Sequence, residues 1–239
     1  MQLYPAIDLK GGKCVRLRQG LFSDVKTYSD NPAEMARRFA ADGATFLHVV
    51  DLDGALQGQS VNLPVIREIR KAVDIPIEIG GGIRSAEAAG ILLDAGIDRV
   101  IVGTKAVKDP SFMRMLVEKF GPEAVAAGVD AKNGIAAVEG WEALSGITAE
   151  ELCLRMKADG VRTVIYTDIS RDGMLTGPNV EATASLTEVT GLNVIASGGV
   201  SSMEDLERLS AAGIRGAIIG KALYEGRVNL SEAVRRFQK

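Results

Sequence analysis

Short apolar runs alternate with longer amphipathic stretches along the whole chain. The runs predict strands, because they are short and are bounded by glycine, proline or polar turn residues. The stretches between them carry apolar residues at helical spacing, as Ala88, Ile91, Leu92 and Ala95 do after Ser85. The predicted strands cover residues 3–7, 46–50, 76–79, 100–102, 124–129, 163–166, 194–197 and 217–219.

Capping residues mark where the intervening helices begin. These starts are Asn31 before Pro32, Asn62, Ser85, Thr148 with Glu151, and Ser201 with Glu204, the last two as capping boxes. Strands that alternate with helices predict a parallel sheet with helical crossovers. Eight such units in 239 residues favour an α/β fold of the closed (β/α)8 TIM-barrel type over an open doubly wound sheet. We expect one domain over residues 1–239, with a small hairpin at Gly11 and Gly12 and loops at 20–30, 131–146 and 169–178.

The second half of the chain repeats the first. Gly81 and Gly198, Gly96 and Gly213, and Gly103 and Gly220 are each 117 positions apart. Three equal spacings in register indicate an internal duplication, with halves of roughly 1–122 and 123–239.

Each half has two glycine-rich turns, each of which follows a strand and opens a helix. Bare backbone N–H groups can approach an anion where no Cβ intrudes, and a helix N-terminus favours negative charge. The sequence therefore predicts two phosphate cradles and a ligand with a phosphate at each end. Lys221 and Arg84, beside these turns, are candidates for ligand contact or for solvent-exposed helix starts.

Aspartates fall at four predicted strand ends: Asp8, Asp51, Asp130 and Asp168. Asp8 and Asp130 follow strands one and five, which lie opposite each other in an eight-stranded barrel. Two facing carboxylates suit general base and general acid catalysis, and the acid must have a pKa well above the usual value of about 3.9. A strand-end Asp can instead cap its own turn, and for Asp51 both interpretations stay open.

Composition narrows the classes of function. A net charge of −3 argues against a nucleic-acid partner. Cys14 and Cys153 form no disulfide framework, and the single histidine, His48, is expected to be structural, so no metal site is predicted. Gly80, Gly81 and Gly82 lack dinucleotide-fingerprint spacing. We expect a cofactor-free proton transfer on a bisphosphate, in a soluble cytoplasmic protein with no signal peptide and no membrane span.

Two loop features remain. Trp141, the only tryptophan, lies among Glu139, Gly140, Glu142 and Gly146, and either stacks on a ligand ring or packs locally. Residues 171–173, Arg-Asp-Gly, are expected to form a mobile loop tip, with Asp172 as a candidate polar contact to the ligand.

Several motifs together resemble one family, the phosphoribosylformimino-aminoimidazole carboxamide ribotide isomerases of histidine biosynthesis. The resemblance runs from the first predicted strand to the last. Its motifs are residues 6–20 (AIDLKGGKCVRLRQG), 79–84 (IGGGIR), 128–130 (GVD), 140–141 (GW), 166–168 (YTD), 171–173 (RDG) and 196–199 (ASGG).

The resemblance implies an Amadori rearrangement, in which an aminoaldose becomes an aminoketose without a cofactor. Asp130 would be the acid that opens the ribose ring, Asp8 the base that removes the proton beside the Schiff base, and Thr167 a hydrogen-bonding residue near the sugar. Trp141 would stack on the imidazole as its loop closes. The other residues expected to bind the substrate are Gly81, Gly82, Gly103 and Thr104 at one phosphate, Gly198, Gly199, Gly220 and Lys221 at the other, and Gly20, Arg84, Asp168 and Asp172.

Three alternatives remain open. The chain could be a dual-specificity isomerase that also accepts phosphoribosylanthranilate, the cyclase subunit of imidazole glycerol phosphate synthase, or a non-catalytic phosphosugar-binding barrel. The cyclase family opens with Cys-Leu-Asp where this chain has Ala6, Ile7 and Asp8. A single barrel of this length buries enough apolar surface to be stable on its own, so we expect a monomer.

Overall fold

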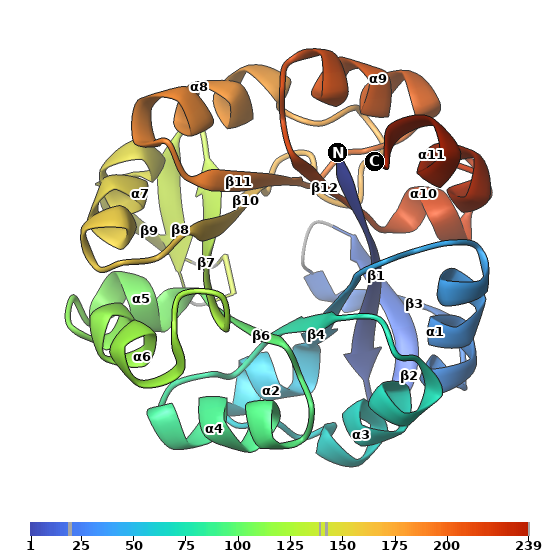
Figure 1. Ribbon diagram of the computed structural model, residues 1–239, viewed down its shortest axis with the longest axis horizontal. Helices are drawn as coiled ribbons and strands as arrows, with labels where there is room; N and C mark the ends of the chain where they lie inside the picture. Colours follow the sequence, from blue (N-terminus) through green and yellow to red (C-terminus); the bar gives the residue numbers. More distant parts are fainter. Residues whose placement is uncertain (19–20, 139, 142, 239) are drawn as a thin grey trace.

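A computed structural model of the protein describes residues 1–18, 21–138, 140–141 and 143–238. In this part of the chain, eight parallel strands form a closed ring (Figure 1). They are β1 (Gln2–Lys10), β4 (Leu47–Asp51), β5 (Ile77–Gly80), β6 (Arg99–Val102), β7 (Val125–Lys132), β10 (Thr163–Asp168), β11 (Asn193–Ser197) and β12 (Gly216–Ile219). β1 pairs with β12 and with β4, and β7 pairs with β10, which closes the ring. The predicted TIM barrel is confirmed.

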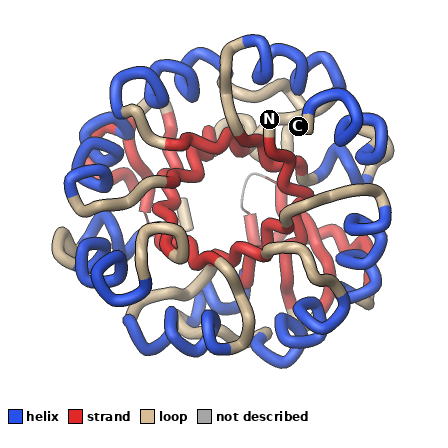
Figure 2. The backbone as a smooth tube through the Cα atoms, in the orientation of Figure 1, coloured by secondary structure: helices blue, strands red, loops and turns tan. Residues whose placement is uncertain are grey.

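Helices surround this ring (Figure 2). The longer ones are α1 (Pro32–Ala41), α3 (Leu63–Ala72), α4 (Ala86–Asp94), α6 (Phe112–Phe120), α7 (Ala149–Ala158), α8 (Val180–Thr190), α9 (Met203–Ala211) and α11 (Leu230–Phe237). Three short helices follow strand ends: α2 (Leu52–Gln57), which was not predicted, and α5 (Thr104–Lys108) and α10 (Lys221–Tyr224), which open after Gly103 and Gly220 as predicted. None of the helices in the described ranges is both long enough and apolar enough to cross a bilayer.

Most predicted helix starts are confirmed. The Asn31 side chain accepts a hydrogen bond from the Glu34 N–H, and Thr148 and Glu151 form the predicted capping box. The start of α9 is a correction, because Ser202, not Ser201, is the N-cap residue. The Ser201 N–H and hydroxyl both donate to the Asp205 carboxylate instead.

Two of the predicted loops are β-hairpins. Gly11 and Gly12 join β1 to β2 (Lys13–Arg18) as expected, and the chain then returns as β3 (Leu21–Ser29). β7 is likewise extended by β8 (Ile135–Val138) and β9 (Ala143–Thr148). The prediction of plain loops at 20–30 and 131–146 is therefore wrong over these strands, of which β8 is a mostly buried apolar run of four residues. Asp8 and Asp130 consequently lie within long strands and not at their ends.

The core has an inner and an outer part. Tyr4, Ala6, Ile101, Ala126, Ile165, Ile195 and Ile218 fill the inside of the barrel. Larger apolar clusters fill the space between strands and helices. One predicted core position is wrong: Ile91 on α4 is 43% exposed, because the buried face of that helix is formed by Ala89 and Leu92.

Candidate active site

A cavity of about 790 Å³ opens at the carboxyl ends of the barrel strands. Among the predicted substrate-binding and catalytic residues, those that line it are Asp8, Gly81, Gly82, Arg84, Gly103, Thr104, Asp130, Trp141, Thr167, Asp172, Gly198, Gly199, Gly220 and Lys221. Gly20 lies outside the described residues. The ends of the parallel strands meet at one rim of the barrel, and this brings together residues that are far apart in the sequence.

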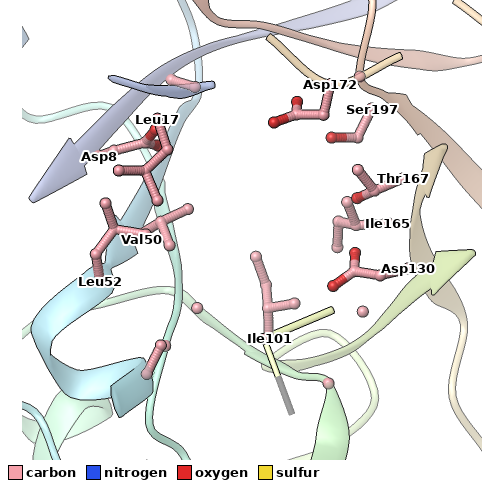
Figure 3. A pocket seen from close by; sticks show the side chains of 18 of the residues that line it. Asp8, Leu17, Val50, Leu52, Ile101, Asp130, Ile165, Thr167, Asp172 and Ser197 are labelled. Carbon is pink, nitrogen blue, oxygen red and sulfur yellow. The ribbon is translucent and has the colours of Figure 1, made fainter. Parts of the chain in front are cut away.

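Asp8 and Asp130 face each other across this cavity (Figure 3). Asp8 comes from β1 and Asp130 from β7, and β4, β5 and β6 separate these strands in the sheet. The two carboxylates therefore approach a ligand from opposite sides, as a base and an acid acting on one molecule require.

The Asp8 carboxylate is held by a residue that the sequence did not single out. Arg16 on β2 donates from Nη1 to Asp8 Oδ2 at 2.8 Å and from Nη2 to the Ala6 carbonyl oxygen. Its guanidinium lies 5.0 Å from the centroid of the Tyr224 ring. Arg16 reaches Asp8 because β2 folds back antiparallel on β1 and pairs Asp8 with Val15. The ion pair orients one carboxylate oxygen of Asp8.

Asp130 is in a different environment. Burial raises its pKa above the ordinary value, and hydrogen bonds from Trp141 and Thr167 and the charge of His48 only partly offset this. The indole Nε1–H of Trp141 donates to Asp130 Oδ2 at 2.8 Å. A carboxyl group with a raised pKa keeps its proton to higher pH, which suits Asp130 to act as a proton donor.

Asp172 is a third carboxyl group at the cavity. Burial and then the nearby charge of Asp8 raise its pKa to about 6, although Arg16 acts in the opposite direction. It lies on the same side of the cavity as Thr167 and Ser197 (Figure 3). Asp172 can therefore reach a ligand in the cavity, as the predicted polar contact requires.

The two predicted cradles lie at the ends of neighbouring strand pairs. β5 pairs with β6 and β11 pairs with β12, so each pair presents two glycine turns together. Gly103 has φ −99° and ψ −104°, and Gly220, 117 residues later, has φ −102° and ψ −107°, so the two glycines share one backbone geometry. Lys105 and Lys108, not predicted, line the cavity near the first pair, and Lys221 lies at the second.

The paired glycines also allow close backbone packing. A Cβ on Gly81 would lie 2.1 Å from the Asp51 carbonyl oxygen, and one on Gly199 would lie 2.4 Å from the Gly177 carbonyl oxygen. Both residues have positive φ. Glycine is therefore required for loop packing at these positions as well as for any approach of an anion.

Asp51 and Asp168 order their loops. The Asp51 carboxylate accepts hydrogen bonds from the backbone N–H of Gly54 and from the side-chain amide of Asn62. Asp168, 117 residues later, accepts from Asn179, which is 117 residues after Asn62. Neither aspartate lines the cavity. Asp168 was expected to bind the substrate, but its side chain is directed to Ser170 and Asn179 within its own loop.

His48 was expected to be purely structural, yet it lines the cavity. Ser197 was also missed. The alternation of side chains along β4 could have placed His48 at the cavity, because a strand that directs Val50 toward the barrel interior directs His48 there too. Among residues 1–18, 21–138, 140–141 and 143–238, no group of three or more His, Cys, Asp or Glu side chains is arranged to hold a metal ion.

Comparison with known proteins identifies the family of this chain. A family described as "Histidine biosynthesis protein" matches residues 2–229. A protein of Lachnoclostridium phytofermentans is 54% identical over 239 residues, which is all of both chains. One of Listeria monocytogenes is 53% identical over 98% of this chain and 97% of its own, and one of Syntrophomonas wolfei is 52% identical over 98% of each.

Each of these relatives is named 1-(5-phosphoribosyl)-5-((5-phosphoribosylamino)methylideneamino)imidazole-4-carboxamide isomerase. The match to the family spans nearly the whole barrel, including both cradles and both facing aspartates. The chain thus belongs to the histidine biosynthesis protein family.

Proposed function

We propose that this protein catalyses the Amadori rearrangement of the phosphoribosylformimino-aminoimidazole carboxamide ribotide to its ribulosyl form. The observation that carries the proposal is the placement of Asp8 and Asp130 on opposite sides of one cavity, between two cradles from the two halves of the barrel. The names of the relatives support this substrate, which has a phosphoribosyl group at each end.

Asp130 supplies the first proton in this mechanism. Protonation of the ribose ring oxygen lets the bond from that oxygen to C1 break, and the nitrogen on C1 provides the electron pair that forms the Schiff base. The raised pKa of Asp130 keeps the proton available for this step. Thr167 on the adjacent strand, paired in register with Asp130, is placed to hydrogen-bond the opened sugar.

Asp8 then removes the proton from C2. The Schiff base accepts the electrons of the C2–H bond, and an enolamine forms. Arg16 holds the Asp8 carboxylate in one orientation for this transfer. Return of a proton to C1 gives the aminoketose, so the reaction needs proton transfers in a positioned substrate and no electron acceptor.

Substrate binding follows from the same geometry. One phosphate lies at Gly81, Gly82, Gly103 and Thr104, and the other at Gly198, Gly199, Gly220 and Lys221. Trp141 releases Asp130 and stacks on the imidazole as the β8–β9 hairpin closes.

The protein acts as a monomer of one domain formed by duplication of a half-barrel, a duplication supported by the equivalent Asp51–Asn62 and Asp168–Asn179 pairs.

The test is turnover of the purified aminoaldose ribotide, run beside phosphoribosylanthranilate. Turnover of the first alone supports the dedicated isomerase. Turnover of both indicates a dual-specificity isomerase. Turnover of neither contradicts the proposal and leads to the cyclase assay with ammonia, and binding of the ribotide without conversion would indicate a silent phosphosugar-binding barrel.

A further inference from the structure

A second cavity, of about 380 Å³, lies on the side of the barrel, between α1, α10 and α11 (Figure 1). Among the described residues, none that lines it also lines the active-site cavity, and the mechanism above gives it no role. Its volume is within the range of pockets that hold small molecules. The chemistry of its walls then decides which class of molecule can bind.

One wall of this second cavity is aromatic. It is formed by Phe39 on α1, Tyr224 on α10 and Tyr28 on β3. The centroids of the Tyr28 and Tyr224 rings are 4.9 Å apart, and the Phe39 ring lies edge-on to Tyr224 at 5.9 Å. Leu230, at the start of α11, adds an aliphatic surface. Planar rings pack favourably on such a wall, so it suits a ligand with a flat ring.

Two opposite charges lie at the same cavity. Arg38 and Asp42 are four residues apart along α1 and its C-cap, so their side chains leave the same face of the helix. Within the described part of the chain, Arg38 has no side-chain hydrogen bond or ion pair, with Asp42 or with any other residue. The Asp42 carboxylate accepts a long hydrogen bond, of 3.3 Å, from the Ser231 hydroxyl. A guanidinium and a carboxylate beside an apolar wall can bind a carboxylate and an ammonium group of one ligand.

Tyr224 connects the wall of the second cavity to the active site. Its hydroxyl donates to the Ala6 carbonyl oxygen at 2.9 Å, and the same oxygen accepts a hydrogen bond from Arg16 Nη2. The Arg16 guanidinium lies 5.0 Å from the centroid of the Tyr224 ring and also binds Asp8. A ligand that packs on Tyr224 therefore restricts the residue that supports the Arg16–Asp8 ion pair.

We propose that the second cavity is a regulatory site for an α-amino acid whose side chain is a planar ring. Arg38 binds the carboxylate, Asp42 binds the ammonium group, and the ring packs between the aromatic wall and Leu230. Occupancy fixes Tyr224, which acts through Arg16 on the orientation of Asp8. The regulation, though not the binding, rests on the proposed isomerase function.

Binding is tested by NMR titration of the ¹⁵N-labelled full-length protein with L-phenylalanine and with L-histidine. Each is compared with the amine that lacks its carboxylate (phenethylamine or histamine) and with the acid that lacks its ammonium group (3-phenylpropionate or imidazole propionate). We expect at least one of the amino acids to bind with a Kd below about 1 mM, and its two analogues to bind about tenfold more weakly or worse.

The same spectra locate the ligand. The amide resonances of Gly226 and Ser231, which line the second cavity, should shift on binding. Shifts confined to the cradle glycines Gly81 and Gly198 would place the ligand in the active site and overturn the inference. Failure of both amino acids to bind, or equal affinity for an analogue that lacks one charge, would also overturn it.

Matched variants test the two charges. Arg38→Gln and Asp42→Asn should each weaken binding by about tenfold or more, because each leaves one charged group of the ligand unpaired. Arg37→Gln is the control, because it removes the same charge from the same helix and Arg37 does not line the cavity. Its Kd should equal that of the wild type, and an equal loss of affinity in this control would contradict the assigned contacts.

Regulation is tested by turnover of the aminoaldose ribotide with the amino acid at saturation. We expect kcat/KM of the wild type to change by about fivefold or more, as is typical of coupling between two sites, and that of Arg38→Gln to change much less at the same concentration. An unchanged kcat/KM in the wild type would overturn the regulatory role, as would an equal change in Arg38→Gln, which would indicate competition in the active site. Inactivity of the wild type without amino acid would instead contradict the proposed isomerase function, and the NMR titration would still decide whether the cavity binds.

Discussion

The indole Nε1–H of Trp141, in the turn between β8 and β9, donates a 2.8 Å hydrogen bond to the carboxylate of Asp130 on β7. The tryptophan expected to stack on a ligand thus contacts Asp130, the proposed general acid. Trp141 also has φ +77°, which is rare for a side chain of this size. The bond couples the conformation of the hairpin to the proton affinity of Asp130.

Removal of this bond should shift the pH dependence of catalysis. The Trp141 N–H lowers the pKa of Asp130, so Trp141→Phe should raise that pKa further. Asp130 acts as an acid, and activity is lost as pH rises through its pKa, so the alkaline limb of kcat/KM should move to higher pH. A pH–rate profile of the variant beside wild type measures this. A limb that moves to lower pH would contradict the assignment.

Substitution of Asp8, the proposed base, should abolish turnover without unfolding the protein. Asp8→Asn keeps the size of the side chain but cannot accept the C2 proton, and we expect kcat to fall by at least roughly 10³-fold. Asp94→Asn on the exposed side of α4 is the matched control for loss of one negative charge, and it should retain full activity. Turnover of Asp8→Asn within a few-fold of wild type would exclude Asp8 as the base.

Asp172 should make the protein less stable at neutral than at acidic pH. Its folded-state pKa of about 6 exceeds the unfolded value of 3.8, so the native state binds more protons between these pH values. The contribution of Asp172 to stability therefore falls as pH rises from about 4 to 6 and stays low above that range. Asp172→Asn should raise the free energy of unfolding by roughly 1–2 kcal/mol at pH 8 and have little effect at pH 4. Urea unfolding at both pH values checks this, and equal effects would contradict it.

Glycine is required at position 199 by packing as well as by conformation. Gly199→Ala would place a Cβ 2.4 Å from the Gly177 carbonyl oxygen, and we expect destabilisation of about 3 kcal/mol or more. Gly226 also has positive φ, but no atom lies within 4 Å of its Cβ position. Gly226→Ala is thus the matched control, with a cost of about 1 kcal/mol from backbone strain alone. Similar melting temperatures for the two variants would show that the close approach at Gly199 is unimportant.

Inorganic phosphate should occupy both cradles in crystals grown at high phosphate concentration. Each cradle combines glycine N–H groups with a neighbouring lysine, Lys105 at one and Lys221 at the other. Density at only one cradle would argue against a ligand with two phosphates.

Local signals in the sequence predicted much of the barrel. The N-cap residues of α1 and α7 are the predicted Asn31 and Thr148, because apolar periodicity and capping act within a few residues. The 117-residue spacing predicted the duplication, and the order of strands then placed Asp8 opposite Asp130. Neither step required knowledge of side-chain contacts.

The remaining features depend on contacts between distant segments. Arg16 reaches Asp8 only because β2 folds back on β1, and His48 meets Glu78 and Arg99 only through the registers of three adjacent strands. Asp168 resembles a ligand-binding residue in the sequence, but Asn179 and Ser170 hold its carboxylate within its own loop. The pattern of apolar and polar residues thus determined the barrel and its two halves, because each strand and helix is specified locally. Only the tertiary structure decided which polar side chains face the cavity and which hold loops in place, because hydrogen-bond partners and burial are set by residues far away in the chain.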